Sequence, residues 1–106
     1  MSKLKIYESS NELCEVILNY IVGNRKVISI TEFDSYTKRI MMIHRKMGLA
    51  LGKSKMDECF NELIIISEEM NVLLLEIKSK YFIMGRLEND IDECFTKFTK
   101  ILKDCQ

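Results

Sequence analysis

The stretch ECFNELIIISEEMNVLLLEIKSKY, residues 58–81, decides the fold of this chain. Apolar residues recur in it every three or four positions, which is the spacing of one face of an α-helix. The runs Ile64–Ile66 and Leu73–Leu75 widen that face, so the helix is expected to touch neighbours on more than one side. The stretch therefore predicts a long helix, over about residues 54–82, that other helices cover.

Three further segments carry the same helical spacing and are separated by glycines. We expect helices over about residues 9–22, 31–51 and 87–104, with breaks near Gly23, Gly52 and Gly85. Short connections between long helices favour antiparallel neighbours. The fold class expected for residues 1–106 is therefore all-α: one up-down antiparallel four-helix bundle with a long third helix.

Two of these segments begin with the pattern of a capping box. Ser9 is followed three residues later by Glu12, and Thr31 by Asp34. In such a box the hydroxyl and the acid satisfy free N–H groups of the first turn. Gly23 stands where a left-handed residue often ends a helix. The sequence therefore predicts helix starts at Ser9 and Thr31 and a stop at Gly23.

The tetrapeptide DECF occurs twice, at residues 57–60 and 92–95. We expect both copies in the first turns of helices, where acids complement the positive end of the helix dipole. We also expect Cys59 and Cys94 in the core. The chain has one histidine, His44, and no C-x-x-C motif, in which two residues separate two cysteines. We therefore predict no metal site. No cofactor-binding motif occurs, and we expect no cofactor.

Length and composition indicate a globular chain that works in the cytoplasm. The 106 residues are 47% hydrophobic and suffice for one domain. No apolar run approaches the length of a membrane span or of a signal peptide, so we expect no membrane partner. The four cysteines lack a disulfide pattern, which is typical of a reducing compartment.

The charge of the chain is balanced in total but not along its length. Residues 23–55 contain eight basic and two acidic residues, whereas residues 56–106 contain eleven acidic and six basic ones. The two regions either neutralise each other, within the fold or between subunits, or the basic region binds phosphate groups. The candidate nucleic-acid-binding residues are Arg25, Lys26, Lys38, Arg39, Arg45 and Lys46.

Arg39 and His44 raise a catalytic alternative. Their spacing fits the HEPN class of helical ribonucleases, in which the histidine moves a proton and the arginine stabilises the developing phosphorane charge. Ile40 stands where a polar residue usually follows the arginine in that class. We keep a HEPN-type ribonuclease as an alternative and expect no catalytic residues.

The order of the segments resembles a family of bacterial four-helix-bundle proteins. The resemblance rests on the basic YTKRI of residues 36–40, the long segment 58–81 and the final LENDIDECFTKFTKIL of residues 87–102. The family includes proteins encoded in intervening sequences of ribosomal RNA genes and the accessory variability protein of diversity-generating retroelements. The resemblance implies rings that bind a reverse transcriptase and nucleic acid. The family's Phe-Pro-Lys stretch and Gly-Trp ending are missing here.

Self-association is the last expectation, because the chain has more apolar faces than one small bundle buries. We predict a non-enzymatic oligomeric accessory protein that binds a protein or nucleic-acid partner in a mobile-element or phage-related system. A small helical secretion or assembly chaperone is the other alternative. The candidate residues of the oligomer interface are Ile64, Ile65, Leu73 and Leu75.

Overall fold

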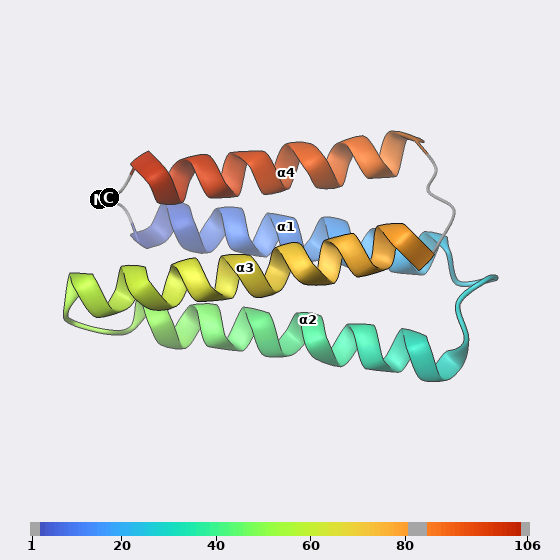
Figure 1. Ribbon diagram of the computed structural model, residues 1–106, viewed down its shortest axis with the longest axis horizontal. Helices are drawn as coiled ribbons and strands as arrows, with labels where there is room; N and C mark the ends of the chain where they lie inside the picture. The colour runs from blue at the N-terminus through green and yellow to red at the C-terminus, as the bar shows by residue number, and fades with distance from the viewer. Residues whose placement is uncertain (1–2, 81–84, 105–106) are drawn as a thin grey trace.

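A computed structural model of the chain describes residues 3–80 and 85–104. Those residues form four α-helices and no strand: α1 (Lys3–Gly23), α2 (Ile30–Leu51), α3 (Met56–Lys80) and α4 (Gly85–Asp104). Consecutive helices run in opposite directions (Figure 1), and α3 is the longest, with 25 residues. The expected all-α, up-down four-helix bundle is confirmed.

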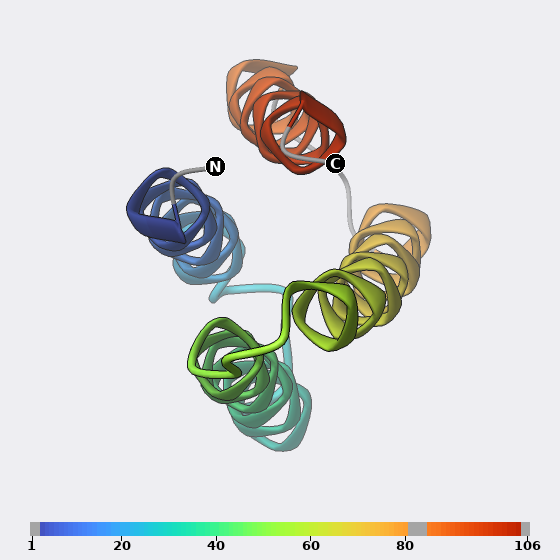
Figure 2. The same ribbon diagram turned by 90° about the vertical axis from the view of Figure 1, so that its left-hand side faces the viewer.

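The four helices surround one apolar core (Figure 2). α4 packs mainly against α1, α3 packs mainly against α2, and α1 also packs against α2, whereas α3 and α4 make little contact. The core is built from one stripe of each helix. Its largest fully buried side chains include Tyr20, Ile40, Leu63, Met70 and Phe98.

The helices begin at other residues than the capping patterns predicted. α1 starts at Lys3, because the fully buried Ile6 continues its apolar stripe toward the N-terminus. Ser9 and Ser10 lie in the middle of α1 and are buried there, so the predicted start at Ser9 was wrong. The N-cap of α2 is Ser29, whose Oγ accepts a hydrogen bond from the Glu32 backbone N–H at 3.1 Å.

The helix ends also differ from the expectation. Gly23 is the last residue of α1, and none of the residues that the structure describes has a positive φ. Gly52 caps α2 in the right-handed conformation, with φ −76° and ψ −9°. A left-handed C-cap at Gly23 was therefore a wrong prediction. Residues 81 and 82 of the predicted third helix lie outside the described residues.

The two DECF copies have different places in the fold. Asp57 and Glu58 lie in the first turn of α3, as expected, and Cys59 is fully buried. The second copy lies about two turns into α4, because that helix already begins at Gly85. Its Cys94 is half-buried and packs against the core, so this cysteine lies at the edge of the core, whereas Cys59 lies inside it. The two copies of DECF therefore do not occupy equivalent positions in their helices.

Candidate functional site

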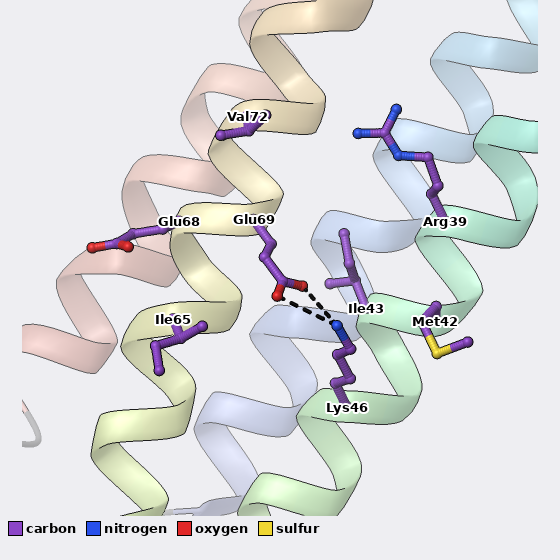
Figure 3. Close-up of a pocket in the computed structure, with 8 residues that line it drawn as sticks. All are labelled: Arg39, Met42, Ile43, Lys46, Ile65, Glu68, Glu69 and Val72. Carbon is purple, nitrogen blue, oxygen red and sulfur yellow. Dashed lines mark hydrogen bonds and ion pairs between the residues drawn. The ribbon is translucent and has the colours of Figure 1, made fainter.

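Three ion pairs connect the α2 side of the bundle to α3. Two start from residues of α2, and the third starts from Lys53, which follows the C-cap Gly52. Each step of seven residues along α2 is matched by a step of seven in the opposite direction along α3, as antiparallel helices with a steady register require. Figure 3 shows the middle pair, in which Lys46 Nζ lies 3.2 and 3.3 Å from the two carboxylate oxygens of Glu69. The pairs are Arg39–Glu76 at 2.8 Å, Lys46–Glu69 at 3.2 Å and Lys53–Glu62 at 2.5 Å.

These ion pairs orient the two helices more than they stabilise them. The paired side chains are between 36% and 45% exposed, so water screens the attraction. Half-exposed pairs of this kind typically contribute between about 0 and 1 kcal/mol each. The hydrogen bond and the charge of Glu62 raise the pKa of Lys53 above its usual value, so this lysine keeps its charge.

Two of these pairs, together with one ion pair within α2, neutralise half of the predicted nucleic-acid-binding residues. Arg39 and Lys46 are paired with α3, and Lys38 is paired with Asp34 at 2.9 Å on its own helix. The hydrogen bond and charge of Asp34 raise the pKa of Lys38. The remaining three candidates are exposed and make no ion pair within the described part of the chain: Arg25, Lys26 and Arg45.

Those three cations do not form one patch. Arg25 and Lys26 lie in the link that follows α1, whereas Arg45 lies well inside α2. At a rise of 1.5 Å per residue, Arg45 is about 22 Å along the helix axis from the first residue of α2. The structure therefore does not bring the predicted basic residues together into one strip of free charge.

Exposed apolar residues alternate with the ion pairs. Met42 and Leu49 lie on α2, seven residues apart, and Ile65 and Val72 lie on α3 at the same spacing. These side chains are 51%, 64%, 56% and 59% exposed, respectively. Because the register follows the ion pairs, Met42 is level with Val72, and Leu49 is level with Ile65. We call these four residues the α2/α3 face.

The α2/α3 face is open to solvent. Two depressions of about 500 and 250 Å³ run along the groove between the helices, on either side of Lys46 and Glu69. Figure 3 shows the first of them, with Ile65 and Val72 on the α3 side and Met42 on the α2 side. Large apolar side chains therefore cover much of a surface on which a solvated helix normally carries charges.

The predicted oligomer interface is placed only in part on this surface. Ile65 belongs to the α2/α3 face, and Ile64 and Leu75 are exposed on the side of α3 nearer to α4. Leu73 is fully buried, so its prediction as a surface residue was wrong. In the run Leu73–Leu75, steps of 100° bring the first two residues into the core and turn the third outward.

Gly48 lies within α2, beside this face. Among the described residues, no neighbouring atom of the same chain requires a residue without a side chain at this position. A Cβ atom at this residue would meet nothing within 4 Å, and the residue is exposed. Glycine inside a helix costs about 0.5–1 kcal/mol relative to alanine. The fold of the single chain therefore gains nothing from the missing side chain.

Arg39 and His44 are directed to opposite sides of α2. Arg39 reaches Glu76 on α3, whereas His44 Nε2 makes a hydrogen bond with Asn11 Oδ1 on α1. The ring of Tyr7 lies 6.0 Å from the His44 ring, centroid to centroid. Within one chain, the geometry does not bring the guanidinium and the imidazole to a common substrate atom.

The described cysteines do not gather into a metal site, and the pKa values of two of their thiols, those of Cys14 and Cys94, are raised. Burial raises the pKa of the Cys14 thiol to about 11. Partial burial, followed by the charge of Glu12, raises the pKa of Cys94, whose Sγ lies 3.7 Å from Glu12 Oε1. Within residues 3–80 and 85–104, no three His, Cys, Asp or Glu side chains are arranged to hold a metal ion.

No protein-family model matches the sequence, and neither a curated protein nor a solved structure matches it. The helices that the structure describes include none with the length and apolarity needed to cross a bilayer.

Proposed function

We propose that this protein is a non-enzymatic accessory protein that works as an oligomer, joined through the α2/α3 face. The supporting observation is the set of four exposed apolar side chains that interrupt the ion pairs of this surface. Complete burial of an exposed large aliphatic side chain contributes about 1.5–3 kcal/mol, and these half-exposed side chains gain part of that when another copy covers them. Four of them on each copy outweigh the small contribution of the half-exposed ion pairs around them.

The charges of this surface favour a protein over nucleic acid as its partner. Three of the six cations that could have bound phosphates already have carboxylate partners in the same chain. Binding a phosphate there requires that these pairs break first. The role in a mobile-element or phage-related system is supported by the order of the segments along the chain, which resembles the accessory proteins of retroelements.

The proposal is tested by measuring mass in solution. Sedimentation velocity over a range of concentrations is expected to give the wild type a mass above one chain, and Ile65→Glu or Val72→Glu the mass of one chain. The matched control is Leu4→Glu, since Leu4 is 64% exposed on α1 and lies off the face. Circular dichroism checks that all variants stay helical. A wild type with the mass of one chain at every concentration refutes the proposal.

A further inference from the structure

We infer that a second copy of this chain covers the α2/α3 face, and that a two-fold axis parallel to the helices relates the two copies. The α2 helix of each copy then lies over the α3 helix of the other, in a closed dimer. This inference rests on the proposed function and specifies its assembly. It is carried by the charges and by the register of the two helices.

The charges make the face complementary to itself. The side chains that α2 presents around the face include Arg39, Arg45 and Lys46, and those of α3 include Glu68 and Glu69. A two-fold axis parallel to the helices exchanges the places of α2 and α3, so the basic helix of each copy faces the acidic helix of the other. Opposite charges that face each other select a partner and fix its register.

The register of the chain places the apolar residues correctly for this contact. Rotation about an axis parallel to the helices leaves the level of each residue along that axis unchanged. Met42 is level with Val72, and Leu49 with Ile65, so each apolar residue lies opposite an apolar residue of the other copy. In the dimer, Met42 of each copy therefore contacts Val72 of the other copy, and Leu49 contacts Ile65.

Arg45 and Glu68 are the charged residues that this arrangement uses. Each precedes a member of the Lys46–Glu69 pair by one residue, so each is turned about 100° away from the groove. Figure 3 shows Glu68 pointing away from α2. Both residues are exposed, and neither has an ion-pair partner among the described residues. In the dimer, Arg45 of one copy and Glu68 of the other come to the same edge at nearly the same level, and the pair occurs twice.

Two further observations agree with this contact. Gly48 follows Arg45 on the outer side of α2, and its missing side chain lets the α3 helix of the other copy approach closely. The molecule is 44 Å long and 25 Å wide, so one long face can supply the roughly 800 Å² per partner of a standard interface. The other two-fold arrangement, with its axis across the helices, lays α2 over α2 and opposes like charges.

A charge exchange tests the arrangement. Arg45→Glu and Glu68→Arg are each expected to raise the dimer dissociation constant at least tenfold, because each places like charges together twice. The double variant is expected to restore the wild-type constant, since both pairs form again with reversed sign. Lys100→Glu, an exposed charge change on α4, is the control and should leave the constant unchanged. A double variant as weak as the two single ones overturns the arrangement.

Disulfide cross-linking gives a second readout that needs no change of charge. In chains with Cys94→Ser and Cys105→Ser, a Met42→Cys chain mixed with a Val72→Cys chain should form mixed disulfides, because only residues a few ångströms apart can be bridged. Disulfides between two Met42→Cys chains instead would overturn the proposed axis. A wild type that sediments as one chain defeats the proposed function itself, whereas a dimer that fails both tests defeats only this arrangement.

Discussion

Lys46 of α2 and Glu69 of α3 meet at the middle of the groove, with Lys46 Nζ within 3.3 Å of both carboxylate oxygens. The two residues lie 23 positions apart in the sequence, so only a pattern that spans both helices can predict this contact. The pair shows the register of the two helices, that is, which residue of α2 lies beside which residue of α3.

The first prediction concerns the strength of this pair. Lys46→Ala and Glu69→Ala, combined in a double-mutant cycle, should give a coupling free energy of about 0.2–1 kcal/mol, because both side chains are partly exposed. Urea unfolding in a Val72→Glu background measures it without a contribution from association. The Asp34–Lys38 pair within α2 is the comparison and should give a smaller coupling, because its two side chains are more exposed than those of Lys46 and Glu69. A coupling of several kcal/mol would contradict the modest weight given to the ion pairs.

The second prediction separates two neighbouring leucines. Leu73→Ala should lower the free energy of unfolding by about 2–5 kcal/mol, because the side chain is fully buried and its removal leaves a cavity. Leu75→Ala should change it by no more than about 0.5 kcal/mol in a monomeric background, because Leu75 is 59% exposed. Urea unfolding of both variants checks the pair. Equal losses would mean that α3 is rotated relative to the core.

The third prediction is a pH dependence that belongs to Cys14. Folding raises the pKa of this thiol from 9.0 to about 11, so the folded chain holds the proton more tightly than the unfolded chain. Stability is therefore expected to fall as the pH rises from about 9 to about 11, by about 1.4 kcal/mol per unit of pKa shift. Subtracting the unfolding curves of a Cys14→Ala variant isolates this contribution from that of other groups. Parallel curves for the two proteins would contradict the burial of the thiol.

The fourth prediction concerns RNA cleavage. Because Arg39 and His44 are held by partners on opposite sides of α2, we expect the wild type not to cleave a labelled RNA in the presence of a chelator. The His44→Ala variant should behave identically in this assay. Cleavage by the wild type that both His44→Ala and Arg39→Ala abolish, with folding intact, would establish the ribonuclease alternative.

The fifth prediction concerns nucleic-acid binding. Only Arg25, Lys26 and Arg45 among the candidate cations lack a carboxylate partner in the described chain, so contact with at most three phosphates is expected. The logarithm of the binding constant should then fall with the logarithm of salt concentration with a slope no steeper than about −3. Fluorescence anisotropy with duplex DNA and with RNA measures that slope. A slope of about −5 or steeper would show that the ion pairs of Lys38, Arg39 and Lys46 open so that these residues bind phosphates.

The fold was predictable because the helical spacing of apolar residues extends over whole segments and does not depend on where each helix begins. The helix starts were not, since Ser29 with Glu32 and Thr31 with Asp34 fit the same capping pattern. Ser29 is the cap because helix formation from Ile30 onward leaves its hydroxyl within reach of the Glu32 N–H. At Ser9, the pattern was outweighed by the burial of Ile6 one turn earlier.

The surface was harder to predict because it depends on the register between helices. The charge asymmetry indicated that the two regions could neutralise each other, but not which residues would pair. A signal was present: basic residues at 39, 46 and 53 and acidic residues at 62, 69 and 76 both recur every seven positions. The exposed apolar residues recur with the same period, Met42 with Leu49 on one helix and Ile65 with Val72 on the other. Met42, Leu49 and Val72 were not predicted, because the prediction depended on the longest aliphatic runs of the third helix.

The seven-residue period of the ion pairs also means that they cannot specify a unique alignment by themselves. If α3 slid along α2 by seven residues, two of the three ion pairs would re-form with exchanged partners. The ion pairs are therefore compatible with more than one register of the two helices. Such a slip displaces the helix ends by about 10 Å at 1.5 Å per residue. The four residues between α2 and α3, which include Gly52 and Lys53, have to bridge that offset at the cost of their turn. The short link therefore fixes the alignment of α2 and α3, and lengthening it with flexible residues is the change that would let the two helices adopt a second alignment, in which two of the three ion pairs re-form.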